Sequence, residues 1–103
     1  MIVLQIDFPS SGPFGDAMTA AFTELAQDIA QEPGLIWKIW TENEVEHSAG
    51  GIYLFVDETS ARSYLAKHSA RLSAFGVQDM RSKIFTANAA LSAIDHFAMP
   101  NTA

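Results

Sequence analysis

The spacing of apolar residues changes several times along this chain, and the order of these changes restricts its fold more than any other feature. Residues 2–8 alternate apolar and polar side chains, a period of two that is typical of a strand. From Asp16 to about residue 31 the apolar residues recur every three or four positions, as on one face of a helix. Asp16 is placed to cap or charge the start of this helix.

A second strand is expected directly after Pro33 and Gly34, because residues 35–42 are short and rich in Ile and Trp. Gly34 must turn the chain between helix and strand, so we expect a positive φ there. Residues 51–57 are almost continuously apolar and predict a third, buried strand. It would pair with the second strand as a hairpin across the polar turn at 43–49.

Helical spacing returns at residues 58–75 and ends at Gly76, and residues 80–87 predict a fourth strand. The order is therefore βαββαβ, two split βαβ units that fold into a four-stranded antiparallel sheet with both helices on one face. This is an α+β fold whose second sheet face is bare. A bare face that carries large apolar residues has to be covered, and the simplest partner is the same sheet of a second copy.

Trp37 and Trp40 lie three residues apart in the second predicted strand. Side chains alternate along a strand, so the two indoles are expected on opposite faces of the sheet. One would serve a cavity on the helix side and the other a dimer interface. The sequence does not distinguish which tryptophan does which.

Residues 1–103 are expected to form one domain, since the chain is shorter than the length at which proteins usually divide. The least defined part is 89–103, where we expect a short helix anchored by Leu91 and Ile94 and fraying after Pro100. Hydrophobic residues make up 49% of the chain, more than one small core needs, which also favours an oligomer.

The net charge of −6 and the lack of a basic run argue against nucleic acid and anionic membranes as partners. The absence of cysteine excludes disulfides and thiol chemistry. The N-terminus lacks the charged start and apolar run of a signal peptide, and no segment has the length of a membrane span. We therefore expect a soluble cytoplasmic protein.

His68 lies near the centre of the apolar face of the second predicted helix and should point at the sheet. It is either a core histidine satisfied by one hydrogen bond, or a proton acceptor or orienting donor in a pocket. Arg71 lies at the edge of the same face, where a solvated side chain is the ordinary outcome.

Several aromatic residues fall on these elements and are candidates to line a flat apolar pocket for a planar substrate. The alternative is plain packing in the core and the interface. With His68 as the candidate catalytic residue, the candidate substrate-binding residues are Phe22, Trp37, Trp40, Tyr53, Tyr64 and Arg71, with Phe55 beside them.

Other polar residues carry weaker signals. Gln5 and Asp7 share one face of the first strand and are expected either at an exposed edge or inside a cavity, with exposure favoured. His47 and His96 lie at no metal-ligand spacing from His68, so no metal site is predicted. No glycine-rich nucleotide motif or nucleophile elbow is present either.

Four stretches, taken in order, closely resemble the YdhR-type monooxygenases of the dimeric α+β barrel superfamily: GPFGDAM (12–18), QEPGLIWKIWTE (31–42), AGGIYLFVDE (49–58) and YLAKHSARL (64–72). The resemblance implies a ferredoxin-like subunit that forms a homodimer sheet to sheet, as a dimeric α+β barrel. It also implies oxidation of a small aromatic, polyketide-like substrate by O2 without a metal, flavin or other cofactor. The likeness fades after residue 88.

The chemistry fits an apolar cavity, because an electron-rich phenolate or enolate can reduce dioxygen directly if the protein binds it, favours its deprotonation and excludes water. A binding protein that sequesters a hydrophobic molecule is the competing hypothesis. Haem degradation by an Asn, Trp and His set ranks third, because Asn43 falls in a turn and nothing places it near His68.

Overall fold

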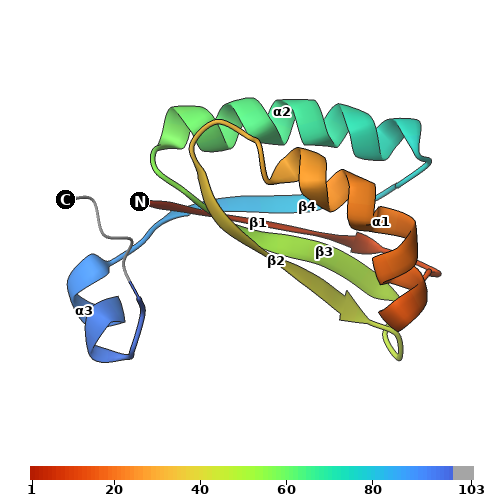
Figure 1. Cartoon of the computed structure of the whole chain (residues 1–103), viewed down its shortest axis with the longest axis horizontal. Helices are drawn as coiled ribbons and strands as arrows, with labels where there is room; N and C mark the ends of the chain where they lie inside the picture. The colour runs from red at the N-terminus through yellow and green to blue at the C-terminus, as the bar shows by residue number, and fades with distance from the viewer. Residues whose placement is uncertain (99–103) are drawn as a thin grey trace.

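The computed structural model describes residues 1–98 and has the predicted ferredoxin-like α+β fold (Figure 1). Its four strands form one antiparallel sheet in the order β2-β3-β1-β4, and α1 and α2 lie on one face of it. A third short helix, α3, lies on the other side of the sheet, beside one end. The elements are β1 (Ile2–Pro9), α1 (Gly15–Ile29), β2 (Leu35–Asn43), β3 (Ser48–Phe55), α2 (Glu58–Ala74), β4 (Arg81–Thr86) and α3 (Ala89–Ile94).

The starts of the two long helices differ in chemistry. The carboxylate of Asp57 caps α2 by accepting a hydrogen bond of 2.8 Å from the backbone N–H of Ser60. At α1 the capping position is Phe14, which has no side-chain acceptor, so Asp16 supplies charge to the first turn and does not cap it.

Gly34 has a φ of +80°, which confirms the expected turn between α1 and β2. A Cβ at this position would lie 2.6 Å from the Cβ of Ser60 on α2 and would also collide with its hydroxyl. Both the conformation and the space therefore require glycine.

β1 lies in the centre of the sheet, so Gln5 and Asp7 are not at an edge as one alternative expected. Their side chains alternate with those of Leu4 and Ile6, which are buried under the helices, and so project from the opposite face. Gln5 is exposed there, and Asp7 accepts a 2.9 Å hydrogen bond from Arg81 of β4.

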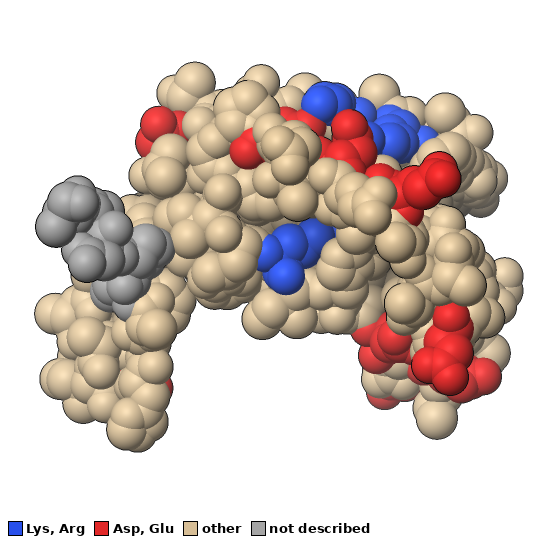
Figure 2. All heavy atoms as spheres, in the orientation of Figure 1, with Lys and Arg blue, Asp and Glu red and all other residues tan. Residues whose placement is uncertain are grey.

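The core lies between the sheet and α1 and α2. Its fully buried side chains include Leu4, Ile6, Ile29, Tyr53, Phe55 and Tyr64. The opposite sheet face keeps Ile39 51% and Phe85 45% exposed, and Figure 2 shows a broad hollow below this face, between α3 and the turn that joins β2 to β3. In the described chain, this face lacks a helical layer like the one that covers the core.

The segment after β4 only partly follows the expectation. Residues 89–94 do form a helix, but Leu91 is 62% and Ile94 74% exposed, so neither anchors it on the core. The expected fraying after Pro100 lies outside the described residues. None of the helices within residues 1–98 is long and apolar enough to cross a membrane.

Candidate functional site

A cavity of about 260 Å³ lies between the helices and the sheet. α1 contributes Met18, Phe22 and Leu25 to its wall, and α2 contributes His68 and Leu72. Lys38 and Trp40 of β2 and Tyr53 of β3 complete the sheet side, with Ile6 and Phe8 of β1. None of the described residues that line the cavity is an Asp or a Glu.

Aromatic rings give this cavity a flat wall. The rings of Phe22 and Trp40 stack, with centroids 6.1 Å apart and planes inclined by 20°. Tyr53 packs against Phe55 and Tyr64, with ring centroids at 6.3 and 5.0 Å. Such walls suit a planar apolar ligand, which can stack on the rings while its polar atoms meet the few polar side chains.

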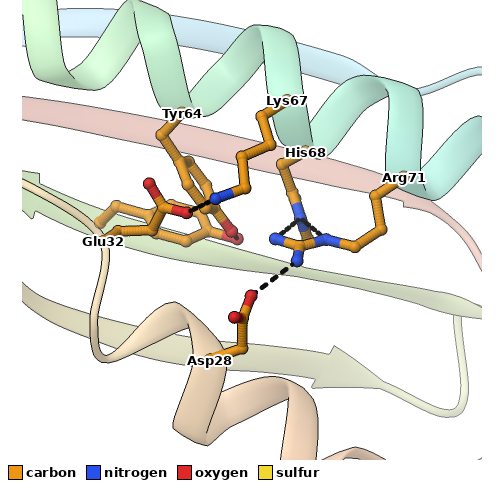
Figure 3. A network of polar contacts seen from close by, with 7 residues as sticks. Asp28, Glu32, Tyr64, Lys67, His68 and Arg71 are labelled. Atoms are coloured by element: carbon orange, nitrogen blue, oxygen red, sulfur yellow. Dashed lines mark hydrogen bonds and ion pairs between the residues drawn. The ribbon is translucent and has the colours of Figure 1, made fainter.

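His68 is 4% exposed and its ring stacks on that of Tyr64 at 5.0 Å. Both Nε and Nη2 of Arg71 approach its Nδ1, at 3.2 and 3.1 Å, and Nη1 of Arg71 donates to Asp28 of α1 at 2.9 Å (Figure 3). An arginine can only donate, so Nδ1 must accept and the proton of a neutral imidazole must be on Nε2.

Burial, assisted by the positive charges of Lys38 and Arg71, lowers the pKa of His68 from 6.5 to about 4. His68 is therefore neutral at pH 7, as its expected burial implied. With Nδ1 occupied by Arg71, the ring can act toward a ligand as a donor through Nε2–H. Of the two sharper roles considered from the sequence, the geometry favours the orienting donor over the proton acceptor.

Tyr53 and Tyr64 share a buried hydrogen bond in which the hydroxyl of Tyr64 donates to that of Tyr53 at 3.2 Å. Burial raises the pKa of Tyr64 to about 12 and raises that of Tyr53 further. Both phenols remain protonated at neutral pH. They can orient a ligand or its neighbours, but neither can remove a proton from it.

Lys38 was not among the residues selected from the sequence. Its Nζ lies 3.5 Å from the ring centroid of Trp40 and 4.7 Å from that of Tyr53. Within residues 1–98 no Asp or Glu forms an ion pair with it. Burial and then the charge of Arg71 lower the pKa of Lys38 from 10.5 to about 7. The available signal was its spacing of two from Trp40, which puts both side chains on one face of a strand.

The structure brings together only part of the predicted site. Phe22, Trp40, Tyr53 and His68 line the cavity, whereas Tyr64 and Arg71 stand behind it and hold Tyr53 and His68.

The two tryptophans face opposite sides of the sheet, as predicted. Trp37 lies outside the cavity and contacts Phe97, with ring centroids 6.5 Å apart. Asn43 is engaged in its turn, where its Oδ1 accepts a 3.0 Å hydrogen bond from the N–H of Glu46. Among the described residues, the side-chain hydrogen bonds of Asn43 go to Glu46 and not to His68. The Asn, Trp and His set considered for haem degradation is therefore not joined by hydrogen bonds. Among the described residues, no three His, Asp or Glu side chains are grouped as metal ligands.

A four-stranded antiparallel sheet under two helices, with an aromatic cavity between the layers, defines a ferredoxin-like α+β protein. Residues 3–98 match the family described as "Putative mono-oxygenase ydhR". The chain belongs to this family, which confirms the resemblance found in the sequence.

Solved structures support the same fold. A "putative antibiotic biosynthesis monooxygenase" from Deinococcus radiodurans has a TM-score of 0.63 at 14% identity, over 85% of this chain and 93% of that one. Protein SO0527 from Shewanella oneidensis has a TM-score of 0.58 at 21% identity, with coverages of 82% and 87%. SnoaB, a cofactor-independent oxygenase from Streptomyces nogalater, has a TM-score of 0.56 at 20% identity, with coverages of 84% and 93%. A search of curated proteins gives no match.

Proposed function

We propose that this protein is a cofactor-independent monooxygenase that oxidises a small planar aromatic substrate with O2. The observation that carries the proposal is the cavity itself, an aromatic chamber whose largely apolar lining includes the imidazole N–H of His68 and the amine of Lys38 among its few polar groups. Membership of a mono-oxygenase family supports the reaction class. The similar fold of SnoaB, described as a cofactor-independent oxygenase, supports the absence of a cofactor.

The proposed reaction needs no outside reductant. A ring methylene activated by neighbouring aromatic carbonyl or hydroxyl groups loses a proton, and the resulting carbanion, delocalised as an enolate, transfers an electron to O2. The two radicals combine into a peroxide anion, which takes back the proton. Loss of water then leaves a carbonyl where the methylene was, so one oxygen atom enters the product and the other enters water.

The protein contributes binding, orientation and a dry environment to this sequence. Phe22 and Trp40 hold the substrate plane, and the Nε2–H of His68 donates to the oxygen on which the enolate charge develops. Arg71 and Asp28 keep the imidazole in the tautomer that can donate. The apolar wall excludes water and so protects the carbanion from reprotonation.

We further propose that two chains pair through the open sheet face to form the dimeric α+β barrel. Ile39 and Phe85 are large apolar residues exposed on this face, and burying it would remove them from water. The hollow next to α3 offers room for a matching surface (Figure 2). A biological interface of this kind would bury more than about 1,000 Å².

Oxygen uptake tests the proposed function. Purified protein, treated with a chelator, is mixed with an anthrone in an oxygen electrode, and the quinone product is followed by its absorbance. We expect uptake of one O2 for each carbonyl formed, with a rate proportional to protein concentration. Stoichiometric binding of the anthrone and related phenols without oxygen uptake would instead identify a binding protein.

A further inference from the structure

We propose that Lys38 is the general base that removes the substrate proton, a role that rests on the proposed oxidation. The oxidation requires a proton acceptor in the cavity. His68 presents N–H to the ligand because Arg71 occupies its other nitrogen, and Tyr53 is a protonated phenol. With no carboxylate among the described lining residues, the Lys38 amine is the remaining group with a lone pair suited to this step.

The packing around Lys38 is built to hold its amine against the aromatic wall. Its Nζ lies over the faces of Trp40 and Tyr53, at 3.5 and 4.7 Å from the ring centroids. On the neighbouring strand, Gly51 has no side chain at the point where Lys38 crosses. A Cβ there would lie 2.8 Å from Cε of Lys38 and 3.1 Å from the ring of Tyr53.

Burial, and then the positive charge of Arg71, keep the amine of Lys38 ready to accept a proton. The facing titratable or charged groups are Tyr53 from β3 and His68 and Arg71 from α2, and none of them carries a negative charge at pH 7. Asp28 of α1 is paired to Arg71, while β1 and α1 present apolar residues to the cavity. A pKa of about 7 leaves roughly half of the amine unprotonated at pH 7, the range in which a general base works best.

The proton transfer balances simply. The substrate C–H or O–H bond breaks, its electron pair stays on the substrate, and the proton binds the lone pair of Nζ. The new ammonium then lies beside the new anion and over two aromatic faces, which stabilise a cation. After O2 has been reduced, the same ammonium returns the proton to the peroxide anion.

Turnover of an anthrone at different pH values tests this role. For the native protein kcat/KM is expected to rise with pH and to level off above an apparent pKa of about 7. Lys38→Met and Lys38→Arg are both expected to lose about 100-fold or more and to lose this pH limb, since Arg keeps the charge but cannot give up its proton. Lys67→Met, on the exposed side of α2, is the matched control and is expected to retain native turnover.

A second measurement does not depend on oxygen chemistry. A hydroxyanthraquinone changes colour when its hydroxyl ionises, so its absorbance under anaerobic conditions reports proton transfer on binding. At a pH where the free probe is neutral, saturating native protein is expected to produce the ionised colour, and Lys38→Met is expected to bind the probe in its neutral form. Gly51→Ala, which displaces Lys38 without removing it, is expected to give an intermediate ionised fraction.

The two measurements separate the two proposals. Ionised probe without any oxygen uptake would refute the oxidation and keep Lys38 as the proton acceptor. Oxygen uptake or an ionised probe that persists at the native level in folded Lys38→Met would overturn the role of Lys38. A probe that stays neutral when bound to the native protein would overturn it as well.

Discussion

Replacing Lys38 by methionine is expected to stabilise the folded protein at neutral pH while removing its proposed base. The pKa of Lys38 is about 7 in the folded chain and 10.5 in the unfolded one, because the amine is buried. Above pH 10.5 the amine is neutral in both states and contributes nothing. As the pH falls from 10.5 to 7, the unfolded state binds a proton before the folded state does, so the free energy of unfolding decreases.

The size of this effect follows from the two pKa values. At about 1.4 kcal/mol per pH unit, the full difference corresponds to at most about 5 kcal/mol. Partial contact with water and the loss of the contacts to Trp40 and Tyr53 reduce the gain from Lys38→Met to about 1–3 kcal/mol at pH 7. For a domain of this length, that is a rise in Tm of about 4–20 °C.

Thermal unfolding followed by circular dichroism, at equal protein concentrations and at pH 7 and pH 10, measures the effect. The advantage of Lys38→Met over the native protein is expected to shrink at pH 10, whereas Arg62→Met removes an exposed ion pair with Glu58 and is expected to change Tm little at either pH. A Lys38→Met protein that is less stable than the native one at pH 7, or equally shifted at both pH values, would refute the reasoning.

Three further predictions concern the turn before β2, the buried histidine and the open sheet face. Gly34→Ala is expected to destabilise the fold by about 1–3 kcal/mol more than Gly76→Ala in urea unfolding, since both glycines have positive φ but only Gly34 meets a neighbouring side chain. With a folded pKa of about 4 against 6.5, His68 binds its proton first in the unfolded state, so stability is expected to fall from pH 6.5 toward pH 4. His68→Gln is expected to lessen that fall, and an unchanged pH dependence would contradict it. Ile39→Glu is expected to give monomers in analytical ultracentrifugation and Ala66→Glu, on the exposed side of α2, to leave the proposed dimer intact. Monomeric native protein would refute the dimer.

The fold could be predicted because the spacing of apolar residues in each strand and helix matches the side that the element buries between the sheet and the helices. The third strand was the least accurate part, since it begins at Ser48 and not at 51. Residues 48–50 look like a turn in composition, yet Ser48 pairs with Pro9 on β1 and with Asn43 on β2. Pairing on both sides overrides the weak strand preference of Ser, Ala and Gly.

The site was predicted less completely, because its chemistry depends on pairs that are distant in the sequence. Helical spacing pointed His68 at the sheet correctly. It could not show that Arg71 would bond His68, or that Asp28, 43 residues earlier on another helix, would hold Arg71 in place. Lys38 could not be predicted as a site residue, because a lysine in a strand is ordinarily solvated. Only the fold shows that its amine lies over the rings of Trp40 and Tyr53.

The central position of β1 has a consequence for how the chain is made. β1 leaves the ribosome before its two neighbours, β3 and β4, whose paired residues lie 39 to 84 positions later. Contacts of such long range slow folding, because bringing the two distant segments together costs chain entropy before the contacts form. Until β4 emerges, one edge of β1 stays unpaired, and an open edge strand invites pairing with other chains. A nascent chain that stalls before residue 81 therefore exposes the middle of its own sheet.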